Sequence, residues 1–174
     1  MSRNKKIVFS ANTSWYLLNF RRSSITAFIE RGYIVFCVAG EDKFSSQLES
    51  LGASFVPIKI RKSSINPLSE IILLINIYLV YRKITPTMIF QFTAKNNLYG
   101  SIASKILAIK CVNNISGLGS GAIGGGITNQ VMKVLYRLVQ NFPLHTHLQN
   151  FDDLEYMKKN KLVNALASSV IPGS

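Results

Sequence analysis

The chain has 174 residues, 48% of them hydrophobic and 16% charged, which excludes a disordered protein and provides for one domain with a normal core. Twenty Lys and Arg stand against eight Asp and Glu, and between residues 50 and 151 ten basic residues accompany a single acid, Glu70. We expect the middle of this +12 chain to attract an anionic partner: nucleic acid, an anionic lipid surface or a phosphorylated substrate.

The sequence also restricts the compartment. Cys37 and Cys111 lie in short apolar runs, so we predict buried, reduced thiols in a cytoplasmic protein. Only three apolar residues follow the basic N-terminus, which does not fit a secretion signal. The apolar run at residues 71–80 has about half of the roughly 20 residues that a membrane-spanning helix needs. We therefore predict a buried or interfacial helix there.

Strand and helix patterns alternate from one end of the chain to the other. The predicted strands cover residues 5–10, 33–39, 54–58, 87–92, 111–115, 145–149 and 169–171. The predicted helices cover residues 15–31, 41–51, 67–83, 96–109, 128–141 and 152–160. Asn66 followed by Pro67 is typical of a helix start, and Gly32 and Gly52 are typical of helix ends.

The connections between these strands fit only right-handed crossovers, so the sequence predicts an α/β fold. We expect a Rossmann-like, doubly wound parallel sheet of about seven strands with helices on both faces, in one domain covering residues 1–174. Ligands of such sheets bind beyond the carboxyl ends of the strands. The loops of interest are therefore residues 11–16, 60–66, 93–97, 116–126 and 150–153.

The glycine-rich segment 114–126 contains G-x-G-x-x-G at Gly119, Gly121 and Gly124. A dinucleotide fingerprint normally follows the first strand, whereas this one follows the fifth, and no acid for the ribose occurs about twenty residues further on. A P-loop is excluded because no Gly-Lys-Ser/Thr follows. The segment remains either a ligand loop, which approaches a pyrophosphate or closes over a substrate, or a disordered surface loop.

Three stretches are more specific: FTAKNNLYGSIASKILAIKCVNNISGLGSG at residues 92–121, LYRL at residues 135–138 and LQNFDDLEYM at residues 148–157. Together they resemble the N-terminal domain of family 4 GT-B glycosyltransferases. IRKSSINPL at residues 60–68 and NTSWYLLNFRRSSITAFIERGY at residues 12–33 fit the same pattern. Within the family, the pattern is most similar to enzymes that transfer sugars onto polyprenyl-diphosphate-linked saccharides in bacterial surface polysaccharide and glycan assembly.

The resemblance implies half of a GT-B fold and a retaining glycosyltransferase. The enzyme would move a hexose or N-acetylhexosamine from a nucleoside-diphosphate sugar to a lipid-linked saccharide. It would be a peripheral protein, bound to anionic lipid on the inner face of the cytoplasmic membrane. In such enzymes the donor binds mainly to a second Rossmann-like domain. We expect that C-terminal domain to be absent, which makes this chain the acceptor half: an isolated domain, a truncated product or one subunit of a split enzyme.

A lipid-diphosphate acceptor requires cations, N–H donors and groups that bind sugar hydroxyls. The candidate acceptor- and phosphate-binding residues are Asn12, Ser14, Arg21, Arg61, Lys62, Lys95, Asn97, Ser116, Gly117, Gly119, Asn150 and Asp153. Instead of binding a ligand, Lys95 and Arg21 could be solvated charges on helix surfaces. We expect Asp152 to have a structural role alone, as a favourable negative charge at a helix N-terminus. Three aromatic residues lie in or beside the first loop: Trp15, Tyr16 and Phe20. Exposed aromatic side chains there would cover a sugar or enter a membrane interface, whereas Tyr16 and Phe20, spaced i, i+4, have core contacts of the first helix as their alternative.

Many members of the family carry a histidine at the position of Ser116, beside the reacting sugar. A serine cannot replace its proton chemistry, so we expect Ser116 near the reaction centre without a catalytic role and assign no catalytic residue. No cofactor is predicted. His145 and His147 share one face of a strand but lack a third convergent ligand, so we predict no metal site.

Two functions of other classes remain as alternatives. A nucleic-acid-binding module would use the same positive charge, but the chain carries no recognised motif and its basic residues are scattered over several helices. An NAD(P)-dependent oxidoreductase domain would use the glycine-rich segment, but it lacks the acid that binds the ribose.

Overall fold

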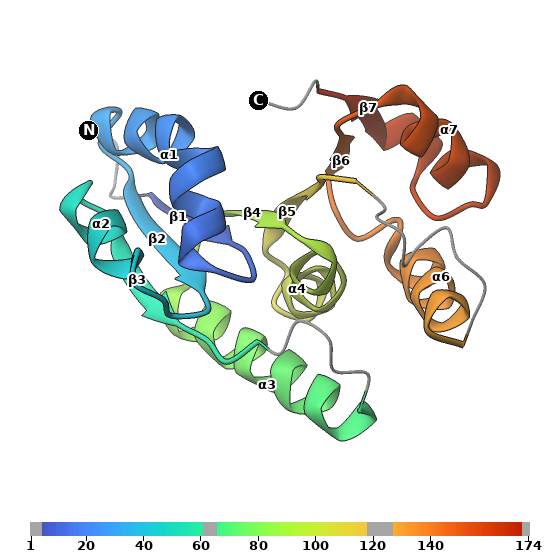
Figure 1. Ribbon diagram of the computed structural model, residues 1–174, viewed down its shortest axis with the longest axis horizontal. Helices are drawn as coiled ribbons and strands as arrows, with labels where there is room; N and C mark the ends of the chain where they lie inside the picture. The colour runs from blue at the N-terminus through green and yellow to red at the C-terminus, as the bar shows by residue number, and fades with distance from the viewer. Residues whose placement is uncertain (1–4, 61–65, 118–126, 172–174) are drawn as a thin grey trace.

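A computed structural model describes residues 5–60, 66–117 and 127–171, and Figure 1 shows their arrangement. Seven parallel strands form one sheet in the order β3-β2-β1-β4-β5-β6-β7, so the predicted Rossmann-like, doubly wound α/β fold is confirmed. The strands are β1 (Lys6–Ser10), β2 (Ile34–Ala39), β3 (Ser54–Pro57), β4 (Met88–Phe92), β5 (Lys110–Ile115), β6 (His145–Leu148) and β7 (Ser168–Val170). The helices are α1 (Ser14–Glu30), α2 (Ser45–Ser50), α3 (Pro67–Ile84), α4 (Ala94–Ile106), α6 (Ile127–Val139) and α7 (Phe151–Lys159).

Helices cover both faces of the sheet. Because successive residues of a strand point to opposite sides, they are buried in two separate apolar clusters. On β1, Ile7 and Phe9 join a cluster with Leu17 and Ile25 of α1. Val8, between them in sequence, belongs to the cluster on the other face, with Ile77 of α3. α1 and α2 therefore cover one face of the sheet, and α3 and α4 cover the other (Figure 1).

A third apolar cluster joins α4, α6 and α7 at the far end of the sheet. Leu98 of α4, Tyr136 of α6 and Met157 of α7 pack there against Ile115 of β5 and Leu148 of β6. This cluster attaches the last three strands and fixes α6 beside α4, which shapes the edge where β4 and β5 end.

The ends of α1 and α3 agree with their sequence signals. Thr13 caps α1 by accepting a hydrogen bond from the Tyr16 amide (3.2 Å), and Gly32 follows the helix with a positive φ of 79°. Asn66 caps α3 through the Leu68 amide (3.0 Å), with Pro67 at its first position. The run at 71–80, predicted as a buried or interfacial helix, is the middle of α3.

Helices α2 and α4 differ most from their predicted bounds. Helix α2 begins at Ser45 rather than at residue 41, since the Asp42 carboxylate accepts hydrogen bonds from the Trp15 and Phe44 amides and holds that segment as a turn. Helix α4 begins two residues early, at Ala94, and ends at Ile106 because Ala108 adopts a left-handed φ of 54°.

Both cysteines are buried free thiols, as predicted. Cys37 faces the cluster under α1, and Cys111 faces the cluster under α3 and α4. Burial raises the pKa of the Cys37 thiol to about 12, so this side chain behaves as a small apolar group rather than as a nucleophile.

Candidate functional site

The carboxyl ends of the parallel strands meet along one edge of the sheet, where ligands of doubly wound folds bind. The strand order reverses between β1 and β4, which are neighbours although the chain leaves β1 toward β2. Loops 11–16, 93–97 and 150–153, and the described start of loop 116–126, all follow strands at this edge. Most of the predicted loop 60–66 lies outside the described residues.

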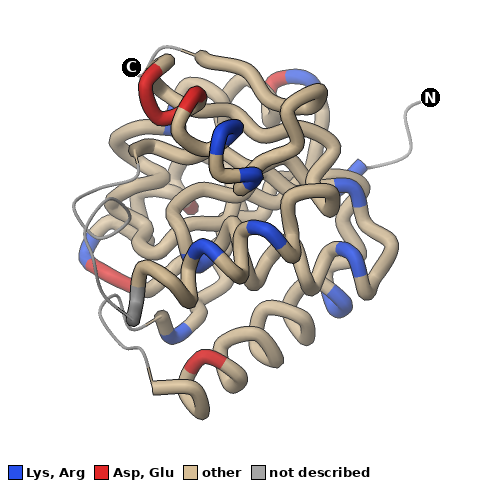
Figure 2. Tube along the Cα trace, turned by 90° about the vertical axis from the view of Figure 1, so that its right-hand side faces the viewer, with Lys and Arg blue, Asp and Glu red and all other residues tan. Residues whose placement is uncertain are grey.

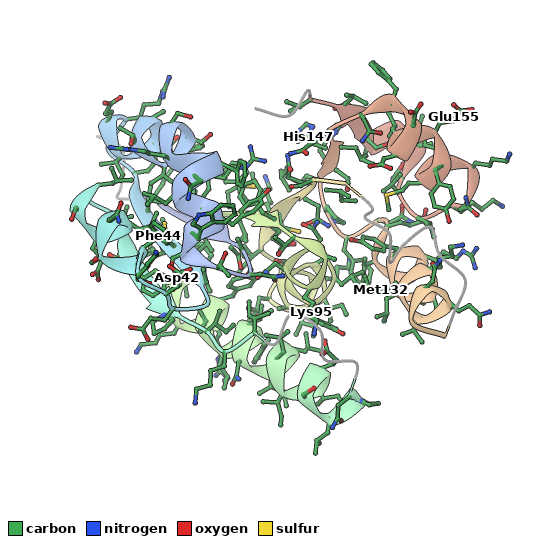
Figure 3. All side chains as sticks on the ribbon, viewed as in Figure 1. Asp42, Phe44, Lys95, Met132, His147 and Glu155 are labelled. Atoms are coloured by element: carbon green, nitrogen blue, oxygen red, sulfur yellow. The ribbon has the colours of Figure 1, made fainter. Side chains whose placement is uncertain are left out.

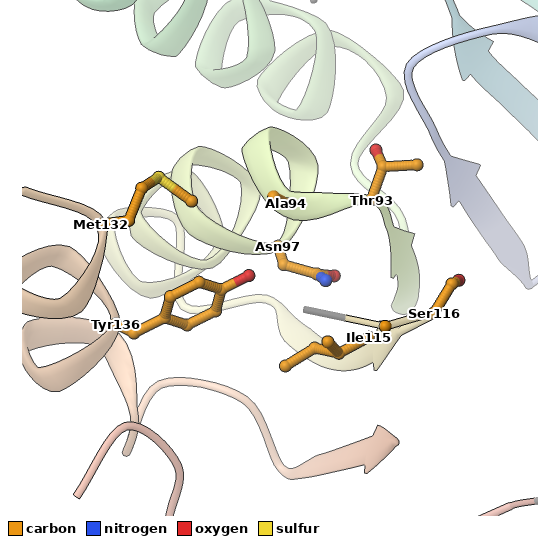
Figure 4. Close-up of a pocket in the computed structure, with 8 residues that line it drawn as sticks. Thr93, Ala94, Asn97, Ile115, Ser116, Met132 and Tyr136 are labelled. Atoms are coloured by element: carbon orange, nitrogen blue, oxygen red, sulfur yellow. The ribbon is translucent and has the colours of Figure 1, made fainter. Parts of the chain in front are cut away.

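A pocket of about 260 Å³ opens between the ends of β4 and β5 and the helices α4 and α6 (Figure 4). Its lining residues are Thr93, Ala94, Asn97, Ile115, Ser116, Gly117, Met132 and Tyr136. Asn97, Ser116 and Gly117 are predicted site residues that the structure brings together. Tyr136 and Met132 are additional, and for Tyr136 the sequence signal was its place in the LYRL stretch.

The backbone at the pocket adopts two unusual conformations. Thr93, which precedes α4, has φ 71° and ψ 149°, a region that residues other than glycine rarely occupy. Gly117, after β5, has a φ of 131°. Because α4 starts directly after Thr93, the positive end of its dipole lies at the pocket, where it favours an anionic group.

Asn97 connects the pocket to the strand beside it. The side chain is fully buried, and its Nδ2 donates to the backbone carbonyl of Asn114 at 3.0 Å. Its Oδ1 is buried without a hydrogen-bond partner in the described part of the chain. Burial raises the pKa of Tyr136 to about 12, an effect reduced by hydrogen bonding with Asn97, so the phenol remains protonated.

Arg21 of α1 lies across the end of the sheet with its guanidinium carbon 4.6 Å from the centre of the Phe92 ring. Its Nη2 donates to Asn114 Oδ1 at 3.2 Å and to the Tyr16 hydroxyl at 3.5 Å. The Tyr16 hydroxyl is in turn hydrogen-bonded to the Ser116 hydroxyl at the pocket. Arg21 is a half-buried cation that forms no ion pair with a described carboxylate.

Asn12 belongs to a polar cluster between the ends of β1 and β4. Its Oδ1 accepts from Asn96 Nδ2 at 2.8 Å, and Asn96 also bonds to Ser10 and Thr93. Asn96 was not among the predicted residues, and its only signal was an amide side chain just after a strand. Ser14 is fully buried and donates to Asp42 Oδ1 at 2.5 Å, so the structure does not bring it to the pocket.

Lys95 lies between α4 and α3 (Figure 3). Its Nζ is 2.6 Å from Glu70 Oε1, and the two side chains are only 14% and 16% exposed. Burial and the neighbouring Glu70 raise the pKa of Tyr99, which places this phenol in the same buried group. Lys95 thus joins the first turn of α4 to α3, and its contact with an acceptor remains a prediction.

Asn150 and Asp153 form the start of α7. The Asn150 side chain accepts from the Asp153 amide at 2.7 Å and donates to Asp153 Oδ2 at 2.9 Å. A Cβ atom on Gly117 would lie 3.9 Å from Asp153 Oδ2, so this carboxylate lies beside the end of β5. Asp152 occupies the first turn of the helix, in agreement with its expected role there.

His145 and His147 are side by side on β6, with ring centres 4.6 Å apart (Figure 3 labels His147). His145 Nε2 and His147 Nδ1 lie 2.9 Å and 3.1 Å from the Ser169 hydroxyl of β7. Burial and the neighbouring His145 lower the pKa of His147. Among the described residues, no group of three metal-ligating side chains is present.

Three predicted residues, Arg61, Lys62 and Gly119, lie outside the described residues, as does the rest of the glycine-rich segment. Within the described ranges, Lys and Arg are distributed over several elements instead of one stripe (Figure 2). No helix in those ranges combines the length and the apolar character needed to cross a membrane.

The model of the glycosyl transferase 4-like family matches residues 6–143 of the chain. No curated protein matches the chain in sequence. Among solved structures, the fold is similar to MurG of Acinetobacter baumannii, with 13% identity and a TM-score of 0.62 over 98% of this chain and 45% of that one. It is also similar to Anabaena Alr3699/HepE in complex with UDP and glucose, with 15% identity and a TM-score of 0.68 over 98% of this chain and 45% of that one.

The same fold occurs in a putative UDP-N-acetylglucosamine 2-epimerase from Listeria monocytogenes, with 11% identity and a TM-score of 0.64 over 97% of this chain and 45% of that one. At these identities the structures share the fold with our chain, and the fold alone does not select a reaction. The chain spans less than half the length of each of these proteins.

Proposed function

The chain belongs to the glycosyl transferase 4-like family, and from this membership we propose that it forms the acceptor-binding half of a glycosyltransferase. The reaction is the transfer of a hexose or N-acetylhexosamine from a nucleoside-diphosphate sugar to a lipid-linked saccharide of bacterial surface polysaccharide synthesis. The acceptor carries a diphosphate between its lipid and its sugars.

The environment of the Arg21 guanidinium is the observation that carries this proposal. Transfer of an unpaired cation from water into a protein is costly, and a guanidinium is well suited to phosphate oxygens. The planar group of Arg21 lies on Phe92, and within the described part of the chain its hydrogen bonds go to neutral oxygens, those of Asn114 and Tyr16. An anionic ligand at this edge supplies the missing counter-charge.

The pocket beside Arg21 supplies neutral groups for the rest of the acceptor. The start of α4 and the Gly117 backbone approach phosphate oxygens, and the Asn97 amide and the Ser116 hydroxyl are suited to sugar hydroxyls. Among the described residues, the hydrogen-bond partner of the Ser116 side chain is the Tyr16 hydroxyl, which is not a base at neutral pH. Its role is therefore to orient the acceptor near the reacting sugar, without moving a proton.

The donor sugar is bound mainly by a second unit, either a further domain or a separate subunit. The solved structures that share this fold are more than twice as long as the part that our chain matches, which leaves room in them for such a unit. One of them was crystallised with UDP and glucose.

We place the chain on the cytoplasmic face of the cytoplasmic membrane, because a polyprenyl-linked acceptor stays in the bilayer. The net charge of +12 favours a surface with anionic lipids. Nucleic-acid binding is the second candidate for the same charge, but the scattered basic residues of Figure 2 fit it less well than a continuous basic stripe would.

Titration calorimetry with a water-soluble, short-chain prenyl-diphosphate saccharide tests this function. We expect saturable binding to the saccharide diphosphate and much weaker binding to the same saccharide without its diphosphate. The control ligand is a single-stranded oligonucleotide at equal phosphate concentration. Tight binding of the oligonucleotide without binding of the saccharide diphosphate would overturn the proposal.

A further inference from the structure

Helix α3 exposes a second apolar face on the side opposite its packed one. Its inner residues Leu73, Ile77, Tyr81 and Ile84 are buried against the sheet and α4. On the outer side, large apolar residues that are 50% to 66% exposed recur at helical spacing: Leu68, Ile71, Ile72, Ile75 and Leu79. A helix that faces water on one side normally carries polar residues there, so this outer stripe indicates a contact surface.

The stripe is positively charged at one end and free of acidic side chains among the described residues of α3. Glu70 is the acid of this helix, but it points inward to Lys95 at 2.6 Å and is only 16% exposed. Arg82 and Lys83 follow Leu79 at i+3 and i+4, are exposed, and thus continue the stripe. The opposite end borders a hollow of about 340 Å³ that Lys59 lines together with Leu68 and Ile72.

The position of α3 allows its whole length to meet a flat surface. The helix forms the lower edge of the molecule in both Figure 1 and Figure 2. Its 18 residues extend over about 27 Å at 1.5 Å per residue. Among the described helices none is long and apolar enough to cross a membrane, and an apolar stripe with flanking cations on such a helix is typical of helices that lie in the plane of a membrane interface.

We propose that the outer stripe of α3 inserts into the interface of a bilayer with anionic headgroups. The apolar side chains enter the boundary between headgroups and acyl chains, while Arg82, Lys83 and Lys59 bind lipid phosphates. A second copy of the chain fits less well, because pairing two antiparallel stripes would bring the Arg82–Lys83 end of one copy to the Lys59 end of the other. A nucleic acid would find no partner for the apolar face.

This docking also orients the site. Glu70, near the start of α3, holds Lys95 in the first turn of α4, and that turn borders the pocket through Ala94. The start of the stripe is therefore adjacent to the pocket, so membrane contact brings the pocket near the headgroups. The inference rests on the proposed function only in this placement, since vesicles without any lipid-linked saccharide suffice to test the surface.

The test is flotation of the full chain with phosphatidylcholine vesicles, with and without phosphatidylglycerol, across a salt series. Ile72→Glu/Leu79→Glu changes two stripe residues that are each 51% exposed. The matched control is Val131→Glu/Val134→Glu on α6, where both residues are also 51% exposed. Circular dichroism and thermal unfolding verify that both variants fold as the parent does.

We expect the α3 variant to lose about tenfold or more of the binding to anionic vesicles, and the α6 variant to stay close to the parent. Arg82→Gln/Lys83→Gln should weaken binding to anionic vesicles only. Equal binding by the folded α3 variant and the parent, or an equal loss in both glutamate variants, would overturn the inference. The short-chain saccharide diphosphate, which needs no membrane, reports separately on the proposed function.

Discussion

Arg21 is the residue whose environment is least explained by the fold itself. Its guanidinium stacks on Phe92 and reaches β5, yet the bonds it makes, to Asn114 and Tyr16, supply no negative charge. We expect Arg21→Ala to weaken the binding of a prenyl-diphosphate saccharide by about 1.5 to 3 kcal/mol, the range for a hydrogen bond to a charged group. Titration calorimetry measures the change.

Arg22 provides the control for Arg21, because it is the next residue of the same helix and is exposed. Arg22→Ala removes the same charge from the chain but not from the site, so it should bind the saccharide diphosphate as the parent does. Equal losses in the two variants would show that net charge, and not the position of Arg21, determines binding.

The buried thiol of Cys37 predicts a loss of stability at alkaline pH. Its pKa is raised by burial to about 12, whereas an unfolded thiol ionises near pH 8.5. The native state therefore holds a proton that the unfolded state releases, so this contribution is complete below about pH 8.5 and decreases by about 1.4 kcal/mol per pH unit above it.

Urea unfolding between pH 8 and 11 measures this slope. The variant Cys37→Ala removes the group, and its free energy of unfolding should fall less steeply with pH than that of the parent. A residual slope is expected, because burial also raises the pKa of Tyr136 and of Cys111. Identical slopes in variant and parent would contradict the assignment to Cys37.

At the scale of elements, α4 packs on β4 at Gly100 with no space for a side chain. A Cβ atom there would lie 2.5 Å from Gln91 Nε2 and 2.8 Å from Gln91 Cδ. Gln91 is fully buried and is hydrogen-bonded to Ser101 and Ser104, so it cannot withdraw freely. We expect Gly100→Ala to lower the free energy of unfolding by about 1 to 3 kcal/mol, as overpacking does.

The double variant Gly100→Ala/Gln91→Ala separates this clash from other effects. Once the glutamine is shortened, the added methyl group has space, so the cost of Gly100→Ala should become smaller. Chemical unfolding of the parent, both single variants and the double variant gives the coupling energy. Additive effects would indicate that the added methyl group destabilises α4 for another reason, such as its approach to the Tyr81 hydroxyl, which lies 3.1 Å from the Cβ position.

Helix ends show which local features a sequence can predict. The caps of α1 and α3 depend on residues within a few positions, such as Thr13 and Asn66, and both helices begin within one residue of the prediction. The starts of α2 and α4 depend on Asp42, whose carboxylate meets α1, and on the positive φ of Thr93. The Asp42 contact joins distant parts of the chain, and the positive φ of a threonine has no local sequence signal, so neither helix start was predictable from the pattern.

The same distinction holds for the whole molecule. Alternating strands and helices predicted the parallel sheet, and hence the edge at which Asn97, Ser116 and Gly117 meet. The partners of the charged residues were not predictable, since Lys95 meets Glu70 and Arg21 meets Phe92 through packing of helices against the sheet. The position of Tyr136 in the pocket lining was also not predictable, since it depends on the packing of α6 against the sheet.

The most direct test of the central claim is amide chemical-shift mapping of the isotope-labelled chain during titration with a short-chain prenyl-diphosphate saccharide. The account predicts that the shifting amides lie at the carboxyl edge of the sheet, around Arg21, in the first turn of α4 and at Ser116 and Gly117. Shifts confined to other surfaces, or the absence of shifts at saturating saccharide, would contradict an acceptor site at this edge.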